Sequence, residues 1–175
     1  MTDSSAVTED AATSAAHAGG AGQYLTFALG NEVYGLEILK VQEIIGMTTV
    51  TKVPRTPEFL RGVINLRGKV IPVVDLRAKF GMETQEDTNL TCIIVVQIVR
   101  DGQQVIMGVI VDEVAEVVDI RSEQIEPPPS LGGTSQTKFI SAMGKVGNKV
   151  IILLDSDKVL SWSELEELAK ASDSA

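Results

Sequence analysis

The chain has 175 residues, a hydrophobic fraction of 44% and a formal net charge of −9, from 15 Lys and Arg against 24 Asp and Glu. No apolar run approaches the roughly 20 residues of a membrane-spanning helix, the N-terminus lacks the pattern of a secretion signal, and the acidic balance argues against non-specific nucleic-acid binding. One cysteine and one histidine exclude an internal disulfide, argue against a zinc site and fit a cytoplasmic protein.

Valine and isoleucine dominate the apolar residues. The chain holds 21 Val and 15 Ile against 14 Leu. Side chains branched at Cβ are restricted at χ1 and favour strands over helices, whereas a helical bundle of this size would rely on Leu and Ala. The composition therefore predicts a mainly β fold.

Residues 1–22 have a different character from the rest of the chain. Val7 is their only large apolar side chain, so this segment cannot bury enough surface to offset the entropy lost on ordering. We predict a disordered N-terminal tail. His17 lies within it, so a catalytic site that depends on histidine is not expected.

From Gln23 to residue 89, short apolar segments alternate with turn residues. Strands are predicted at 24–29, 33–38, 62–66 and 69–74, with a third apolar segment at 41–47. Gly30-Asn31 and Arg67-Gly68 are typical of turns between strands. Asp75 precedes the sequence LRAKFG and is typical of an N-cap that opens a short helix.

Residues 83–89 form a polar, acidic break, after which the β-rich pattern returns. Further strands are predicted at 91–99, 105–111, 114–118, 139–146 and 150–154, with an extended Pro- and Gly-rich loop at 127–133. Ser161 and Glu164 have the spacing of a capping box, and apolar residues follow at three-residue steps. A C-terminal helix that docks one face on the body is therefore predicted within 161–175.

The two β-rich stretches resemble each other. At an offset of 73, Gly35, Val41 and Glu43 match Gly108, Val114 and Glu116; at an offset of 80, Phe59, Lys69, Val70, Ile71 and Asp75 match Phe139, Lys149, Val150, Ile151 and Asp155. The offset changes at the Pro-rich loop, where an insertion is easily tolerated. This self-similarity indicates a duplication. Because sheets of such short strands must close to avoid open edges, we expect two tandem barrels, at 23–89 and 90–160, with a binding crevice between them.

No catalytic, cofactor or metal site is expected. Asp75 and Asp155 could form a paired-carboxylate site, but their ordinary interpretation is two helix N-caps. Residues 132–138 lack the Gly-Lys-Ser/Thr ending of a phosphate-binding loop. Cys92 opens an apolar strand and is interpreted as a partly buried thiol.

Glu43 and Arg67 are charged residues within or beside apolar strand segments. They are either two solvated side chains at strand edges or a cross-strand ion pair that orients the surface around it. Arg61 and Gly62 follow Phe59 and Leu60, and an exposed surface of arginine and apolar residues is typical of protein interfaces.

Two blocks of the sequence resemble the CheW family of chemotaxis coupling proteins. VYGLEILKVQEIIG at 33–46 resembles the family's early signature, and PEFLRGVINLRG at 57–68, followed by VIPVVDLR at 70–77, resembles its most characteristic block. The resemblance covers one CheW-like domain at about 23–170. It implies two SH3-like five-stranded β-barrels related by pseudo-two-fold symmetry, with short helices and a C-terminal helix.

The family is one of non-enzymatic adaptors. The resemblance implies that the chain bridges the cytoplasmic tips of chemoreceptors to the regulatory domain of the histidine kinase CheA, with the receptor in the groove between the barrels and the kinase mainly on the first barrel. Matching positions at the kinase and receptor interface are Val41, Glu43, Ile44, Arg61, Gly62, Asn65 and Arg67. Matching positions on the groove side are Cys92, Gly108, Val114 and Val117.

The length leaves no room for a fused kinase or receiver domain, so the resemblance implies a stand-alone coupler. We expect it to be monomeric alone, to join a ring or array with its partners, and to be cytoplasmic but recruited to membrane-associated receptor arrays. Two alternatives remain at this point. One is a coupling protein of a non-swimming chemosensory pathway, such as surface motility or gene regulation. The other is a small β-barrel that binds a metabolite, which would need convergent polar residues in the crevice.

Overall fold

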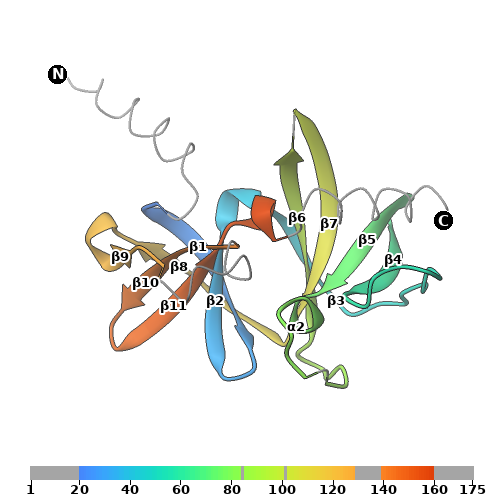
Figure 1. Cartoon of the computed structure of the whole chain (residues 1–175), viewed down its shortest axis with the longest axis horizontal. Coiled ribbons are helices and arrows are strands. Elements are labelled where there is room, and N and C mark those ends of the chain that lie inside the picture. The colour runs from blue at the N-terminus through green and yellow to red at the C-terminus, as the bar shows by residue number, and fades with distance from the viewer. Residues whose placement is uncertain (1–19, 84, 101, 129–138, 160–175) are drawn as a thin grey trace.

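The structure is a computed structural model that describes residues 20–83, 85–100, 102–128 and 139–159. Its strands are β1 (Gly22–Leu29), β2 (Glu32–Glu37), β3 (Val41–Gly46), β4 (Leu60–Leu66), β5 (Lys69–Asp75), β6 (Cys92–Arg100), β7 (Gln103–Val111), β8 (Glu113–Ile120), β9 (Ile125–Glu126), β10 (Ile140–Val146) and β11 (Lys149–Leu154). Short helices are η1 (Ile38–Lys40), α2 (Leu76–Lys79), η2 (Ser122–Gln124) and η4 (Ser156–Lys158). Figure 1 shows the strands gathered into two bodies side by side.

The predicted strands are confirmed, and the two-residue strand β9 is an addition. β1 begins at Gly22, one residue earlier than the predicted start of the first barrel at Gln23. The predicted C-terminal helix at 161–175 lies outside the described residues, as does the predicted tail up to residue 19. Within the described ranges, no helix is both long enough and apolar enough to cross a membrane.

The two sheets have the same internal order, which confirms the repeat. One sheet runs β3-β6-β7-β5-β4, and the other runs β8-β1-β2-β11-β10 and ends on β9. Each contains one parallel pairing at the repeat-equivalent place, Val73 with Gly108 and Leu153 with Gly35. We call the sheet of β3 to β7 the first barrel and the sheet of β1, β2 and β8 to β11 the second barrel.

The repeats exchange strands, so neither barrel follows the predicted ranges 23–89 and 90–160. β1 and β2 of the first repeat pair with β8 and β11 of the second, while β6 and β7 complete the first barrel. The connection explains this arrangement. Only Asp112 separates β7 from β8, and one residue is too short for a hairpin that would return the chain to the same sheet. The chain therefore runs on into the other barrel.

Short backbone bridges close both sheets. In the first barrel, Thr51 and Val63 exchange two N–H to O hydrogen bonds of 2.8 Å. In the second barrel, β9 pairs with β10 at Glu126 and Met143. These bridges pair part of the β4 and β10 edges, which such short strands would otherwise expose.

Three apolar cores hold the molecule together. One lies inside the first barrel, one inside the second, and the third is shared between them. Successive residues of a strand point to opposite faces: Ile93 and Val95 of β6 enter the first barrel's own core, whereas Ile94, Val96 and Ile98 enter the shared core. The strand is buried on both faces, which explains why its sequence is almost continuously apolar.

The shared core corrects the expectation of a crevice between the barrels. Leu25, Phe27 and Leu36 of the second barrel pack there with Ile94 and Val109 of the first, and all five are buried. The space between the barrels is therefore filled with side chains. Only the margin of this core, which we call the seam, is accessible to a partner.

Two ion pairs stabilise the points where the chain crosses between the barrels. In one the short helix supplies the cation, and in the other it supplies the carboxylate. Arg77 of α2 binds Asp112, the residue between β7 and β8, with contacts of 2.6 and 2.8 Å. Asp157 of η4, the repeat equivalent of Arg77, binds Lys40 of η1, between β2 and β3, at 3.2 Å. Each short helix thus ties one repeat to the other repeat's crossover and sets the orientation of the barrels.

Candidate interaction surface

The turn between β4 and β5 carries Arg67 in an unusual backbone conformation. Its φ is 50°, in the left-handed region that favours glycine, and the repeat-equivalent Gly147 has a φ of 62°. The Asn65 side-chain oxygen accepts a hydrogen bond of 2.8 Å from the Gly68 N–H and steadies the turn. The chain therefore keeps an arginine where the fold alone would favour a glycine.

Arg67 and Glu43 form an ion pair, which decides between the two interpretations that the sequence left open. Arg67 Nη1 donates to Glu43 Oε2 at 2.7 Å, and Nη2 donates to Oε1 at 2.5 Å. Hydrogen bonding from Arg67 lowers the pKa of Glu43 below its ordinary value. The guanidinium side chain remains 71% exposed. Two parallel hydrogen bonds fix its orientation at the end of the first barrel, in a position to meet a partner.

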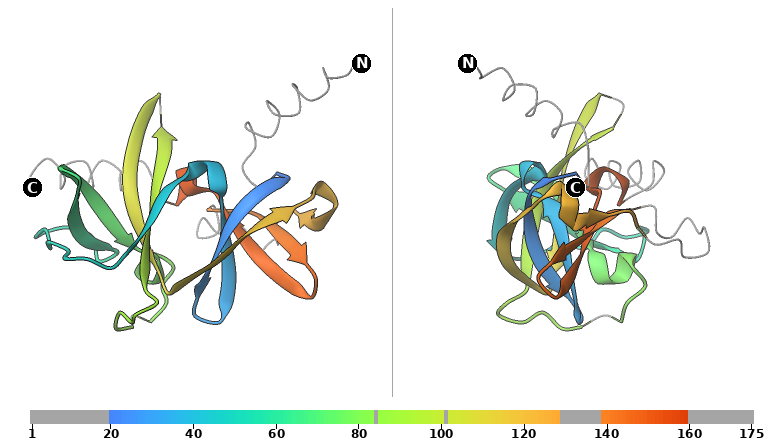
Figure 2. Two further views of the ribbon diagram at one scale, coloured as in Figure 1. Left: turned by 180° about the vertical axis from the view of Figure 1, so that it is seen from behind. Right: turned by 90° about the vertical axis from the view of Figure 1, so that its left-hand side faces the viewer.

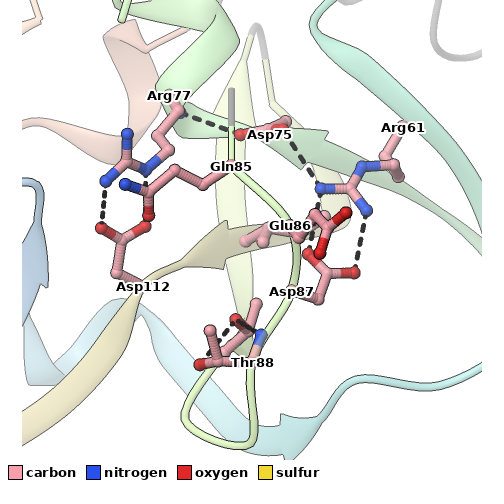
Figure 3. Close-up of a pocket in the computed structure, with 10 residues that line it drawn as sticks. Arg61, Asp75, Arg77, Gln85, Glu86, Asp87, Thr88 and Asp112 are labelled. Atoms are coloured by element: carbon pink, nitrogen blue, oxygen red, sulfur yellow. Dashed lines mark hydrogen bonds and ion pairs between the residues drawn. The ribbon is translucent and has the colours of Figure 1, made fainter. Parts of the chain in front are cut away.

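Arg61 lies on one side of a polar cleft beside this barrel, opposite Arg77 (Figure 3). From β4 it donates to Asp75 at 3.2 Å and to both oxygens of Asp87, at 3.1 and 3.4 Å. Asp75 also accepts from the Arg77 N–H at 3.0 Å, as the predicted N-cap of α2. Asp155 caps η4 in the same way, so both N-cap predictions are confirmed.

The cleft continues to the crossover at Asp112. There Arg77 donates to the carboxylate and to the Glu83 carbonyl oxygen, and the Gly30 N–H donates to Asp112 at 2.8 Å. The hydrogen bond from Arg77 lowers the pKa of Asp112. The three aspartates of the cleft, Asp75, Asp87 and Asp112, are thus each bound by an arginine (Figure 3). The pairing of each aspartate with an arginine is suited to holding the loops around the cleft together.

Two of the predicted interface residues, Arg61 and Gly62, make contacts that stabilise the fold. Arg61 is half-buried and binds the 83–89 segment through Asp87, so its guanidinium is largely occupied. Gly62 is buried, with a φ of 151°, and a Cβ there would lie 2.2 Å from the Thr51 carbonyl oxygen. Only glycine permits the close approach that closes the first barrel.

Four predicted residues lie along the seam, two from each barrel. On β3, Val41 pairs with Val96 and Ile44 with Ile94. On β8, Val114 pairs with Phe27 and Val117 with Leu25. All four pairing partners belong to the shared core. Figure 2 (left) shows β3 and β8 on the same side of the molecule. Ile44 is 42% exposed and Val117 is 47% exposed, so both present apolar surface to a partner.

The other two residues predicted on the groove side, Cys92 and Gly108, lie in different places. Cys92 is half-buried, packs against the shared core and directs its thiol to the Leu90 carbonyl oxygen at 3.2 Å. Gly108 is buried inside the first barrel, where a Cβ would lie 2.6 Å from Ile93 Cγ2. Gly108 therefore permits packing of β7 against β6 and does not line the seam.

Sequence reasoning missed the residues that fix the cleft and the crossovers: Arg77, Asp87, Asp112, Lys40 and Asp157. Nothing local marks them, because Asp87 depends on a contact with the distant Arg61 and the other four depend on contacts between the two repeats. The repeat could have indicated one of them, since Arg77 and Asp157 occupy equivalent positions after equivalent N-caps. Among the residues that the structure describes, no group of three or more His, Cys, Asp or Glu is placed to hold a metal ion.

Comparisons with known proteins agree on one family. Residues 23–164 match the model of the CheW-like domain. The chain is 42% identical to "Chemotaxis protein CheW" of Klebsiella aerogenes over 143 residues, which cover 82% of this chain and 84% of that protein. It is 32% identical to the protein of the same name from Treponema pallidum, over 84% of this chain and 86% of that one.

A solved structure has the same fold. It is the crystal structure of the scaffolding protein TtCheW from Thermoanaerobacter tengcongensis, with a TM-score of 0.73 and 38% sequence identity. The match covers 82% of this chain and 95% of that one. The likeness therefore extends across both barrels.

Proposed function

Because the chain belongs to the CheW family and is a chemotaxis scaffold, we propose that it couples the cytoplasmic tips of chemoreceptors to the regulatory domain of a CheA-type histidine kinase. It does so by holding both partners at once, without catalysing a reaction. It works in the cytoplasm, is monomeric alone, and joins receptor arrays at the membrane through these contacts.

The seam supports the receptor contact. Ile44 and Val117 expose apolar side chains, with Val41, Cys92 and Val114 half-buried beside the shared core. An amphipathic helix binds by laying its apolar face on such a surface. A receptor tip placed here would contact both barrels, so its position would depend on the angle between them.

The end of the first barrel supports the kinase contact. Arg67 is held by Glu43 before any partner arrives, and Asn65 and Val70 are exposed on the same hairpin. A charged group that is already oriented loses little entropy on binding, which favours affinity and specificity. Arginine with exposed apolar surface is also the composition that protein interfaces prefer.

The polar cleft does not favour the metabolite-binding alternative. Its three aspartates are bound by Arg61 and Arg77, so its charged groups converge on one another. A non-swimming chemosensory pathway would use the same contacts, and the proposal covers it as a variant of the same coupling role.

The seam can be tested with single charged substitutions. Ile44→Glu and Val117→Glu are each expected to lower the affinity for a purified receptor tip at least about tenfold, because a carboxylate would lose its hydration against the apolar face. Binding of the kinase regulatory domain should change little. Isothermal titration calorimetry with each partner measures both effects.

A matched control is Val99→Glu, at an exposed valine near the end of the β6–β7 hairpin. It adds the same charge away from the seam and should leave receptor affinity unchanged. If Val99→Glu weakened receptor binding as much as Ile44→Glu and Val117→Glu did, the seam would not be the receptor site.

A further inference from the structure

The end of the second barrel differs in charge from the equivalent end of the first. In the first barrel, Asp75 pairs with Ile110 across the parallel strands β5 and β7. At the repeat offsets of 80 and 73, the equivalents of these two residues are Asp155 and Glu37. The apolar neighbour of the aspartate in the first barrel is therefore replaced by a second carboxylate in the other.

The register of β2 and β11 brings Glu37 and Asp155 side by side. These strands are parallel neighbours, and their last pair is Leu36 with Leu154. The next residue of each strand points to the opposite face, so the two acidic side chains lie beside each other at the end of the second barrel. Glu37 is half-buried, and the Asp155 side chain is only 12% exposed. Like charges on neighbouring strands at such a position repel each other.

The first barrel compensates its aspartate with an arginine, and the second barrel does not. Arg61 donates to Asp75 at 3.2 Å. The repeat equivalent of Arg61 is Ser141, whose hydroxyl donates instead to a backbone carbonyl oxygen of β11 at 3.1 Å. Asp155 is paired with Lys158, but at 4.0 Å and with a lysine side chain that is 65% exposed. The second barrel therefore places two carboxylates together with little compensating charge.

The other groups around Glu37 do not neutralise it. On β1, the paired residue Tyr24 directs its hydroxyl to a backbone carbonyl oxygen at 2.6 Å. Lys40 of η1 favours the ionised form of Glu37, but its ammonium group binds Asp157 of η4 at 3.2 Å. Burial, together with the charges of Asp155 and Asp157, outweighs Lys40 and raises the pKa of Glu37 above its ordinary value. Within the described part of the chain, no hydrogen bond or ion pair holds the Glu37 carboxylate.

The helix that Asp155 caps connects the two barrels. Asp155 accepts a hydrogen bond of 3.0 Å from the Asp157 N–H at the start of η4. The Asp157 carboxylate accepts in turn from Lys40 of η1 and from the Val99 N–H of β6, both at 3.2 Å. Repulsion at the N-cap of η4 therefore acts on the contact between the second repeat and the first barrel.

We propose that Glu37 and Asp155 form a proton-responsive switch at the second crossover. Proton uptake by Glu37 in mildly acidic solution ends the repulsion between the two carboxylates and tightens the attachment of η4 to β6. The switch is a property of the fold and does not depend on which partners the chain binds.

The direction of the pH effect follows from the raised pKa. The folded chain binds the Glu37 proton more tightly than the unfolded chain, in which the pKa is about 4.3. Ionised Glu37 therefore reduces stability at neutral pH, and this penalty is lost as the pH falls through the folded pKa towards about 4. The sign is opposite to that expected for a carboxylate held by an arginine, such as Asp112.

A titration of the Glu37 carboxyl carbon by nuclear magnetic resonance in the full chain tests the pair directly. In the wild type the pKa of Glu37 should lie above its ordinary value of about 4.3. In Asp155→Asn it should move towards that value, because the neighbouring charge is gone while asparagine still caps η4.

A neutral substitution tests the effect on the fold. Glu37→Gln should raise the melting temperature at pH 7 by roughly 2–4 °C, because it removes a like-charge contact between strands. The difference from the wild type should vanish near pH 4. Hydrogen exchange of the Val99 amide, corrected for the intrinsic rate, should show stronger protection at pH 5 than at pH 7 in the wild type and equal protection in Glu37→Gln.

Glu32→Gln is the matched control, because it removes the same charge from the exposed other end of β2. It should change neither the melting temperature nor the protection of Val99. The switch would be overturned if Glu37 of the wild type titrated at or below about pH 4.3, or if Glu32→Gln stabilised the fold as much as Glu37→Gln did. Protection of Val99 that did not respond to pH in the wild type would also overturn it. Each of these failures would leave the proposed function standing.

Discussion

Replacing Arg67 by glutamate should lower the affinity for the kinase regulatory domain by about tenfold or more without unfolding the protein. The substituted carboxylate would lie against Glu43, where the wild type has two hydrogen bonds of 2.7 and 2.5 Å. Like charges at such a contact repel and turn the side chains away, so the oriented surface is lost. Titration calorimetry gives the affinity, and far-ultraviolet circular dichroism checks the fold.

The positive φ of Arg67 makes glycine a better control substitution at this position than alanine. Arg67→Gly removes the side chain and relieves the strain of a φ of 50°. Its melting temperature should equal or exceed that of the wild type, yet its kinase affinity should fall. The double variant Arg67→Glu with Glu43→Arg reverses the pair and should keep the fold. Unchanged kinase affinity in both Arg67→Glu and Arg67→Gly would refute the role of this pair.

Arg77→Met should destabilise the fold by about 3 kcal/mol, because it leaves a partly buried carboxylate at Asp112 without its cation. The Arg77 side chain is only 10% exposed and donates to Asp112 and to the Glu83 carbonyl oxygen. For a chain of this size, the loss corresponds to a fall in melting temperature of roughly 6–12 °C. Urea unfolding and calorimetry measure the two quantities.

The second crossover provides the comparison. Lys40→Met breaks the pair with Asp157, whose side chains are 28% and 30% exposed and therefore better solvated. Its cost should be about 1 kcal/mol or less. Equal losses from Arg77→Met and Lys40→Met would show that burial of the pair does not determine its contribution.

The same pair predicts a pH dependence. The pKa of Asp112 is lower in the folded chain than its ordinary value of about 3.9. Its contribution to stability is therefore complete above about pH 5 and is lost as the pH falls through the folded pKa. In Arg77→Met this part of the acid-induced loss should disappear, which urea unfolding at several pH values between 3 and 7 measures.

The β content, the repeat and the two N-caps could be predicted because each depends on local pattern. Alternating or continuous Val and Ile mark strands, and Asp75 and Asp155 precede short helices in matching contexts. The Glu43–Arg67 contact was one of two interpretations, because a cross-strand pair requires a register that the sequence does not contain.

The exchange of strands could not be predicted from the repeat. The sequence pattern would be the same if each repeat formed a barrel by itself. In the structure, β1 and β2 of the first repeat pair with strands of the second, and β6 and β7 of the second pair with strands of the first. The decisive feature is that a single residue separates β7 from β8. The sequence does not define the ends of these two strands sharply. Gly108 was misplaced for the same reason, since its face depends on the parallel pairing with Val73.

The central claim is that one chain holds receptor and kinase together, and a competition measurement tests it most directly. The chain is first saturated with the receptor tip, and the kinase regulatory domain is then titrated while sedimentation velocity follows the complex. The seam and the Glu43–Arg67 surface involve different residues, so a ternary complex should form with kinase affinity equal to or above that of the free chain. If the kinase domain instead displaced the receptor tip, the two sites would overlap and the account of coupling would be contradicted.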